Sequence, residues 1–184
     1  MKSAIASGNP PRRRHGDLGL ASALRMGVVT CAMLLHGLPP ATAAEKVRDN
    51  EFQVAYATSG MYKEIKENVE LAITEQGLVI NNVSHVADML ANTGKDLGFT
   101  RQVYLHGEVF EFCSATLSRE MTEADPGLIV LCPYTVQVWE TPDKPGTIYV
   151  GYRRLPVTGT EAARAATAKV NALLEKIVGA ALAW

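Results

Sequence analysis

Two histidines, a methionine and two cysteines are the side chains of this sequence best suited to bind a metal or a cofactor. His85 and Met89 stand four residues apart and therefore share one face of a predicted helix. His106 lies in a predicted loop, and Cys113 and Cys132 follow it in the chain. All three residue types are ligands for soft transition metals or haem iron. These five residues raise the hypothesis of a haem or copper site, although a core Met89 and a surface His85 explain the same pattern without one.

The cysteine pair, Cys113 and Cys132, has two further interpretations. In an exported chain such a pair suggests a disulfide, and closing a loop of about 20 residues adds on the order of 3 kcal/mol in the loop-entropy description. Two buried free thiols explain the pair equally well. The pair lacks the Cys-x-x-Cys spacing that lowers the pKa of a thiol, so redox chemistry ranks behind both interpretations. A Cys-x-x-Cys-His motif is absent as well, which excludes covalent attachment of a c-type haem.

Sequence motifs of hydrolases and nucleotide-binding enzymes are missing from the chain. It contains no Gly-x-Ser-x-Gly, no His-Glu-x-x-His and no P-loop pattern. Glu108 with Glu111, or Asp88 with Asp96, would provide paired carboxylates for acid–base chemistry. Carboxylates at such positions more often belong to a solvated face. We therefore predict no catalytic residues, and the sequence indicates no reaction.

Residues 1–44 have the three parts of a secretory signal peptide. Five basic side chains and one acid precede an apolar run, residues 26–38, which ends in the small residues 39–44. Ala41 and Ala43 fit the −3 and −1 positions of a cleavage site before Ala44, and Thr42 and Ala44 offer an alternative site one residue later. The 13-residue run is shorter than the roughly 20 residues of a membrane-spanning helix. We predict cleavage, a periplasmic protein and no stable membrane span afterwards; the alternatives are an uncleaved anchor and a disordered tail.

The charge balance argues against polyanionic partners. The chain has 184 residues, of which 47% are apolar and 20% charged, and its net charge is −1. Removing five basic and one acidic side chain with residues 1–44 leaves 13 basic and 18 acidic residues, a net charge of −5. A domain with this charge repels nucleic acid and anionic lipid, so neither is an expected partner.

The elements that must position the candidate residues follow from the apolar periodicity of residues 45–184. Strands are predicted at residues 51–57, 78–83, 109–113, 134–139 and 147–153. Helices are predicted to begin at Thr58-Ser59, at Ser84, at Ser114 and at a capping box, Thr158–Glu161. The second helix is predicted to face the core with Val86, Met89 and Leu90, and to end near Gly94 or Gly98.

This order of elements predicts an α+β fold, a four- to five-stranded mixed or antiparallel sheet with helices packed on it. Residues 45–160 form the predicted domain, and residues 161–184 form an additional amphipathic helix. Its apolar stripe comprises Ala166, Val170, Leu173, Leu174, Ile177, Val178, Ala181 and Leu182. Packing on the sheet or on a second subunit would bury the same stripe.

Several short motifs give the chain a resemblance to a known family. The segments 108–115, 124–126 and 131–136 resemble the domain of unknown function 302 family, and residues 84–90 and 150–154 resemble its exported subgroup. The resemblance covers residues 52–157, leaving the C-terminal helix outside it. It implies a compact α+β domain that tends to form dimers and has no established enzyme activity. Many relatives have Pro-Cys or no cysteine at Cys132-Pro133, so the resemblance implies no thiol function.

The sequence thus predicts an exported small-ligand- or protein-binding domain without established catalysis, forming a dimer in the periplasm of a Gram-negative bacterium. One alternative is a haem- or copper-binding redox protein that uses histidine, methionine or cysteine ligands. Another is a thiol–disulfide protein that uses Cys113 and Cys132. A further reading is a structural protein whose C-terminal stripe docks another chain.

Overall fold

The side chains of the central strands alternate between buried and more exposed positions. These strands pair into an antiparallel sheet. The structure, a computed structural model, describes residues 43–183, so nearly all of the predicted signal peptide lies outside the described residues. The strands are β1 (Glu45–Asp49), β2 (Gln53–Ser59), β3 (Ile80–Ser84), β4 (His106–Phe112), β5 (Tyr134–Glu140) and β6 (Thr147–Arg153). The helices are α1 (Tyr62–Thr74), α2 (Val86–Leu97), α3 (Ala115–Ala124), the 3-10 helix η1 (Pro126–Leu131) and α4 (Glu161–Ala181).

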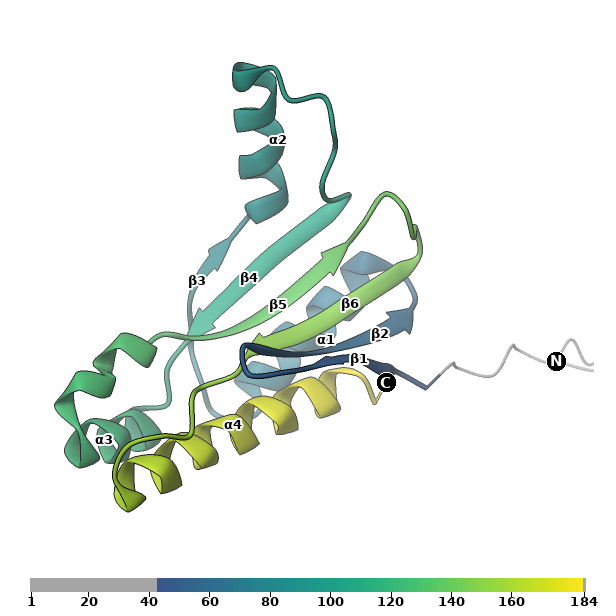
Figure 1. The fold of residues 1–184 in the computed structure, drawn as a ribbon. Helices are drawn as coiled ribbons and strands as arrows, with labels where there is room; N and C mark the ends of the chain where they lie inside the picture. Colours follow the sequence, from purple (N-terminus) through teal and green to yellow (C-terminus); the bar gives the residue numbers. More distant parts are fainter. Residues whose placement is uncertain (1–42, 184) are drawn as a thin grey trace, which may run out of the picture. The chain divides into compact units, whose positions relative to one another are not determined.

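The sheet has six strands in the order β1-β2-β6-β5-β4-β3, with every neighbouring pair antiparallel (Figure 1). The predicted α+β class is confirmed. The predicted number of strands, four to five, was wrong because β1 was not predicted. All five residues of β1 are exposed, and four of them are charged, so the strand has no apolar alternation to find. A charged edge strand of this kind discourages pairing with another sheet.

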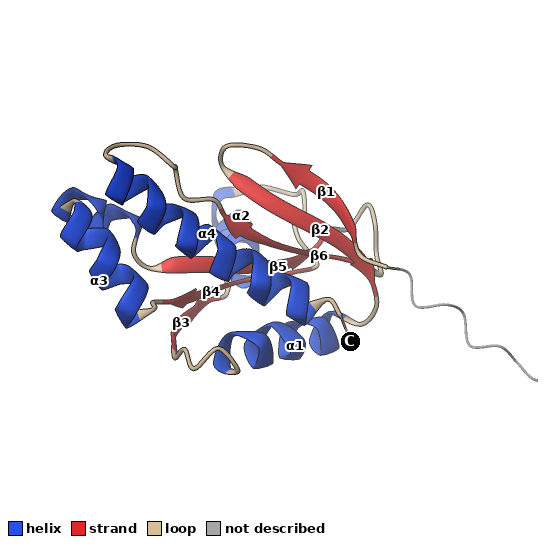
Figure 2. Cartoon of the chain, turned by 90° about the horizontal axis from the view of Figure 1, so that it is seen from below, coloured by secondary structure: helices blue, strands red, loops and turns tan. Residues whose placement is uncertain are grey.

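Helices α1, α3 and α4 cover one face of the sheet and enclose the core with it (Figure 2). Tyr134, Val136 and Val138 of β5 point into this core, as their alternation predicts. The two ends of β6 coincide with the predicted strand at residues 147–153. Helix α4 buries eight of its residues there, so it packs on the sheet of its own chain.

Helix α2 differs from the others because none of its residues is buried. It rises from one edge of the sheet and stands apart from the other helices (Figure 1). The prediction that Val86, Met89 and Leu90 face the core was therefore wrong, since this chain's own core does not reach them. Of the two predicted ends, Gly94 lies inside the helix and Gly98 is its C-cap, in the left-handed conformation that favours glycine at a helix end.

Three element boundaries also differ from the sequence expectations. Helix α1 starts at Tyr62, because Thr58 and Ser59 still pair with β6 as part of β2. Thr160 caps helix α4, and its carbonyl accepts the Arg164 amide. Thr158, the first threonine of the predicted capping box, does not cap the helix. His106 opens β4 and does not lie in a loop. None of the helices in residues 43–183 has both the length and the apolarity needed to cross a membrane.

Candidate functional site

Three adjoining hollows meet where α2 leaves the sheet. The first, of about 380 Å³, lies between α2 and the segment 99–104. The second, of about 200 Å³, lies against β4 and β5, and the third, of about 50 Å³, lies at the start of β4. Shared lining residues join them: Ala87 links the first to the third, Tyr104 the first to the second, and Gly107 and Glu108 the second to the third. The base of α2 is therefore a concave region formed by three connected hollows.

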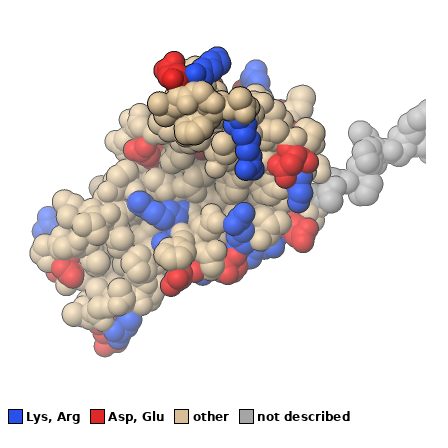
Figure 3. Space-filling view, turned by 45° about the horizontal axis from the view of Figure 1, so that its top comes forward, with Lys and Arg blue, Asp and Glu red and all other residues tan. Residues whose placement is uncertain are grey.

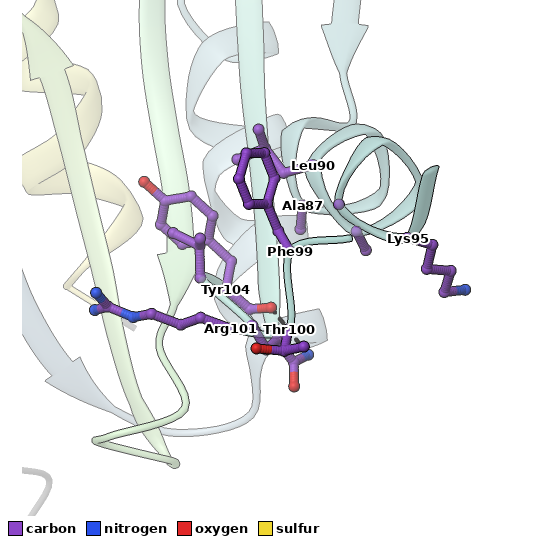
Figure 4. A pocket seen from close by; sticks show the side chains of 11 residues that line it. Ala87, Leu90, Lys95, Phe99, Thr100, Arg101 and Tyr104 are labelled. Carbon is purple, nitrogen blue, oxygen red and sulfur yellow. Dashed lines mark hydrogen bonds between the residues drawn. The ribbon is translucent and has the colours of Figure 1, made fainter. Parts of the chain in front are cut away.

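The first hollow has an apolar wall. Ala87 and Leu90 contribute the side of α2, and Phe99 and Tyr104 lie across from it (Figure 4). The charged residues of its lining are both basic, Lys95 and Arg101. Arg101 extends past Tyr104, whereas Lys95 points away from the helix on its outer side (Figure 4). The hollow thus offers apolar surface with positive charge at its margins.

The second hollow lies on the sheet face opposite the core. Val86 of α2 and Tyr104 border it, and Gln137 and Trp139 of β5 line it. The Trp139 ring stacks on Tyr149 of β6, with centroids 5.3 Å apart and planes 13° from parallel. The surface beside the protruding α2 is mostly uncharged, with separate charged side chains around it (Figure 3). No helix within residues 43–183 packs over this aromatic face.

The third hollow contains a carboxylate with three hydrogen-bonding or ionic partners. Glu108 Oε1 lies 2.8 Å from Nδ1 of His85, and Glu108 Oε2 lies 3.3 Å from Nζ of Lys66. The Tyr62 hydroxyl donates to the same Oε2 at 3.3 Å. Burial, followed by the Glu108 charge, raises the pKa of Tyr62 well above its usual range, so this hydroxyl stays protonated. The Glu108 side chain is 12% exposed, so its interpretation as part of a solvated face was wrong.

His106 faces the same hollow from the first position of β4. Its ring stacks on Tyr62 with centroids 4.6 Å apart, and its Nε2 lies 3.9 Å from Oε2 of Glu140. Glu140 is itself buried and accepts the Gly146 amide at 2.7 Å, which connects it to the β5–β6 turn. The two histidines that the sequence singled out, His85 and His106, therefore lie beside one polar hollow.

The two cysteines lie at the other end of β4. Cys113 follows Phe112, the last residue of β4, and Cys132 precedes β5 by one proline. Within the described residues both are free thiols, partly exposed. The Cys132 thiol donates to Oγ of Ser118 at 3.7 Å. Burial, followed by the neighbouring Cys132, raises the pKa of Cys113.

The structure thus divides the five candidate ligands into separate places. His85 and His106 are at one end of β4, and Cys113 and Cys132 are at the other, about 20 Å away at roughly 3.3 Å per residue. Met89 lies on α2 and is 55% exposed. One metal ion cannot contact both ends of the strand. Among residues 43–183, no three histidine, cysteine or acidic side chains are grouped closely enough to hold a metal.

Sequence reasoning missed Tyr62, Lys66, Tyr104 and Trp139, which complete the hollows. These residues come from α1, β5 and a connecting segment, so no local spacing brings them together. One signal was present in the sequence. Trp139 and Tyr149 occupy the outward positions of two alternating strands, and large aromatic side chains at such positions indicate a contact surface.

The comparisons with known proteins agree with this architecture. The family described as "Domain of unknown function DUF302" matches residues 54–181, most of the chain. The chain belongs to this family. The match extends through α4, so the helix that the motif resemblance left outside is part of the DUF302 domain.

A solved structure shows the same fold. The crystal structure of an uncharacterized conserved DUF302 protein from Bacillus stearothermophilus superimposes with a TM-score of 0.59. The two sequences are 14% identical, and the similarity covers 72% of this chain and 99% of that chain. No curated protein matches the chain. The DUF302 assignment therefore establishes the fold, and function has to be argued from the surface.

Proposed function

We propose that this DUF302 protein is an exported, non-catalytic binding domain that works as a homodimer. The observation that carries the proposal is an apolar stripe on α2 that continues into the aromatic face of the sheet. The two surfaces meet at Val86, which lies on α2 and borders the hollow over β4 and β5. Neither surface is covered by another element within residues 43–183.

The stripe on α2 has the spacing of a packed helix face. Val86, Leu90 and Leu97 follow one another at intervals of four and seven residues, which places them on one side of the helix. Leu90 is 38% exposed and Leu97 is 64% exposed. Exposed apolar patches of this kind, rimmed by polar residues, mark interaction surfaces.

The shape of the surface favours a second copy of the chain as the partner. Helix α2 protrudes, and the sheet face beside it forms the floor of a corner (Figures 1 and 3). In a two-fold dimer each copy supplies both a protruding helix and a corner, so one pair of surfaces is satisfied twice. Trp139, Tyr149 and Phe99 supply the aromatic composition that protein interfaces favour.

The first hollow supports a second candidate function, the binding of a small ligand. Its volume of about 380 Å³ falls within the range of ligand pockets. Apolar walls with Arg101 at the margin fit an apolar molecule that carries an anionic group. Anilinonaphthalene sulfonate is a suitable probe. We expect saturable fluorescence that Gly94→Leu abolishes by filling the hollow; unchanged binding in this variant would contradict the assignment.

A native, non-reducing mass spectrum of the protein, produced with its own N-terminal segment, tests export and assembly together. We expect a dimer whose chains begin at Ala44 or Glu45. Chains that keep residues 1–44 would contradict cleavage. A monomer at every concentration would contradict the proposed dimer.

A matched pair of variants locates the interface. Leu90→Glu places a carboxylate in the stripe, whereas Asn92→Glu adds the same charge on the opposite side of α2. Burying an unpaired charge costs several kcal/mol, so we expect Leu90→Glu to weaken the dimer by at least about tenfold. Asn92→Glu should leave the dissociation constant unchanged. Equal effects of the two variants would place the interface elsewhere.

A further inference from the structure

A cysteine flanks each end of the α3–η1 segment, residues 114–131, which lies between β4 and β5. Cys113 precedes this segment and Cys132 follows it. Figure 1 shows α3 at the end of β4 away from α2, so this region is separate from the binding surface proposed above. Among the described residues these are the two cysteines, and both are partly exposed.

Strand pairing brings the two ends of this segment together. Phe112 of β4 pairs with Tyr134 of β5 at this end of the sheet. Cys113 directly follows Phe112, whereas Pro133 separates Cys132 from Tyr134, so the two cysteines flank the same strand end one position out of register. The Cys132 side chain is a hydrogen-bonding neighbour of the Cys113 thiol, so the two sulfurs lie close together. The fold therefore places two free thiols side by side without a Cys-x-x-Cys motif.

A pair of hydroxyl groups lies beside these thiols. The Cys132 sulfur lies 3.7 Å from Oγ of Ser118, which in turn lies 2.9 Å from the Tyr134 hydroxyl. When Cys132 ionises, the Ser118 hydroxyl can donate to the thiolate, because a hydroxyl rotates to serve either role. This contact favours Cys132 as the attacking sulfur.

We propose that Cys113 and Cys132 form a reversible dithiol–disulfide couple that exchanges with disulfide-bonded molecules and, when oxidised, closes the α3–η1 segment at its base. This activity goes beyond the proposed binding function and is independent of it. Its co-reactant is a disulfide, either a small molecule or an exposed bond in another protein.

The exchange balances in two displacement steps. Cys132 loses its proton to solvent and attacks one sulfur of the external disulfide, whose S–S bond breaks and releases one thiolate. Cys113 then loses its proton and attacks the Cys132 sulfur, breaking the mixed disulfide and releasing the second thiolate. The protein gives up two electrons and two protons, and the external disulfide becomes two thiols.

The environment of Cys113 fits the second, resolving role. Burial and the adjacent Cys132 raise the pKa of Cys113, so it remains a thiol at neutral pH and is the slower nucleophile towards an external disulfide. Once Cys132 carries the mixed disulfide, proximity compensates for this low reactivity because the second attack is intramolecular.

Equilibration of the full chain with mixtures of reduced and oxidised glutathione tests the proposal. The protein used in this experiment carries the substitution Cys31→Ser, so that Cys113 and Cys132 are its remaining cysteines. After acid quenching and alkylation, we expect a species that has lost two hydrogens and takes up no alkylating group. Its fraction should rise with the oxidised share of glutathione and return to zero on reduction. Failure of this species to form under the most oxidising mixture would overturn the proposal.

Single variants test the two roles. Cys113→Ser keeps the attacking sulfur, so we expect it to accumulate one glutathionyl adduct quickly. Cys132→Ser should form the adduct more slowly, because its remaining thiol is the less reactive one. Independent adducts on both cysteines of the parent protein, without the internal disulfide, would also overturn the couple. The dimer measurement with Leu90→Glu does not involve these residues, so the two proposals fail separately.

Discussion

Helices α4 and α2 are both amphipathic, but the structure uses them in opposite ways. Helix α4 buries eight residues against the sheet, whereas α2 buries none and stands apart from the core. The apolar stripes of the two helices are similar in spacing. The comparison teaches that an amphipathic stripe by itself does not determine whether a helix packs on the core of its own chain.

Polar contacts also distinguish α4 from α2. Glu175 of α4 accepts hydrogen bonds from the hydroxyls of Tyr56 and Tyr152, and Asn171 exchanges two hydrogen bonds of 2.9 Å with the backbone of Leu155. Helix α2 has one comparable contact, at its N-cap residue, whose imidazole lies 2.8 Å from Glu108. Helix α4 is therefore part of the cooperative core, and α2 is attached to it at one end.

The largest test of this comparison is the same truncation in each helix. Leu174→Ala removes a side chain with no exposed area, so we expect the free energy of unfolding to fall by about 2–5 kcal/mol. Leu90→Ala on α2 should change it by no more than about 0.5 kcal/mol. Urea unfolding measures both, at protein concentrations low enough that dimerisation adds nothing. Similar losses from the two variants would mean that α2 belongs to the core.

A smaller test uses the one glycine inside each helix. Added as alanine, a Cβ at Gly179 of α4 meets no atom within 4 Å, and one at Gly94 of α2 meets Phe99 at an ordinary 3.7 Å. Alanine favours a helix over glycine, so Gly179→Ala should raise the global free energy of unfolding by about 0.5–1 kcal/mol. Gly94→Ala should instead slow amide exchange within α2 by up to about fivefold and leave global stability unchanged. A global gain from Gly94→Ala would contradict local opening of α2.

The smallest expected effect is a loss of stability at low pH that originates in α4 and not in α2. Burial by itself would raise the pKa of Glu175, but hydrogen bonds from Tyr56 and Tyr152, together with Lys46, outweigh it and lower the pKa. Burial, and then Glu175, raise the pKa of Tyr152 to about 12, so its hydroxyl remains a donor throughout. The stabilisation is therefore complete above the unfolded carboxyl pKa of about 4.3 and declines as the pH falls through the lowered folded value.

Glu175→Gln provides the control for this pH dependence. The variant should be less stable than the parent at neutral pH, and its unfolding midpoint should fall less steeply between neutral pH and pH 3. Thermal unfolding across this range measures the difference. Identical pH profiles for the two proteins would exclude Glu175 as the origin of the acid sensitivity.

Much of the fold could be predicted because its signals are local. The strand at residues 147–153, the strand that begins at Tyr134 and the stripe of α4 all follow from periodicity, and the structure confirms them. Strand β1 was not predicted because it has no alternating apolar pattern. It is a strand because it pairs with β2. The candidate site was found in fragments: His85 and His106 were identified, but Glu108 was assigned to a solvated face.

The sequence by itself determined the α+β class, the buried faces of the central strands and the family resemblance. These properties depend on residues a few positions apart, whose spacing on a strand or helix is set by backbone geometry. Tertiary structure alone decided which stripe meets the core, which cysteines become neighbours and which charges surround Glu108. Those contacts join residues from different elements, which only the packing of the helices and strands brings together.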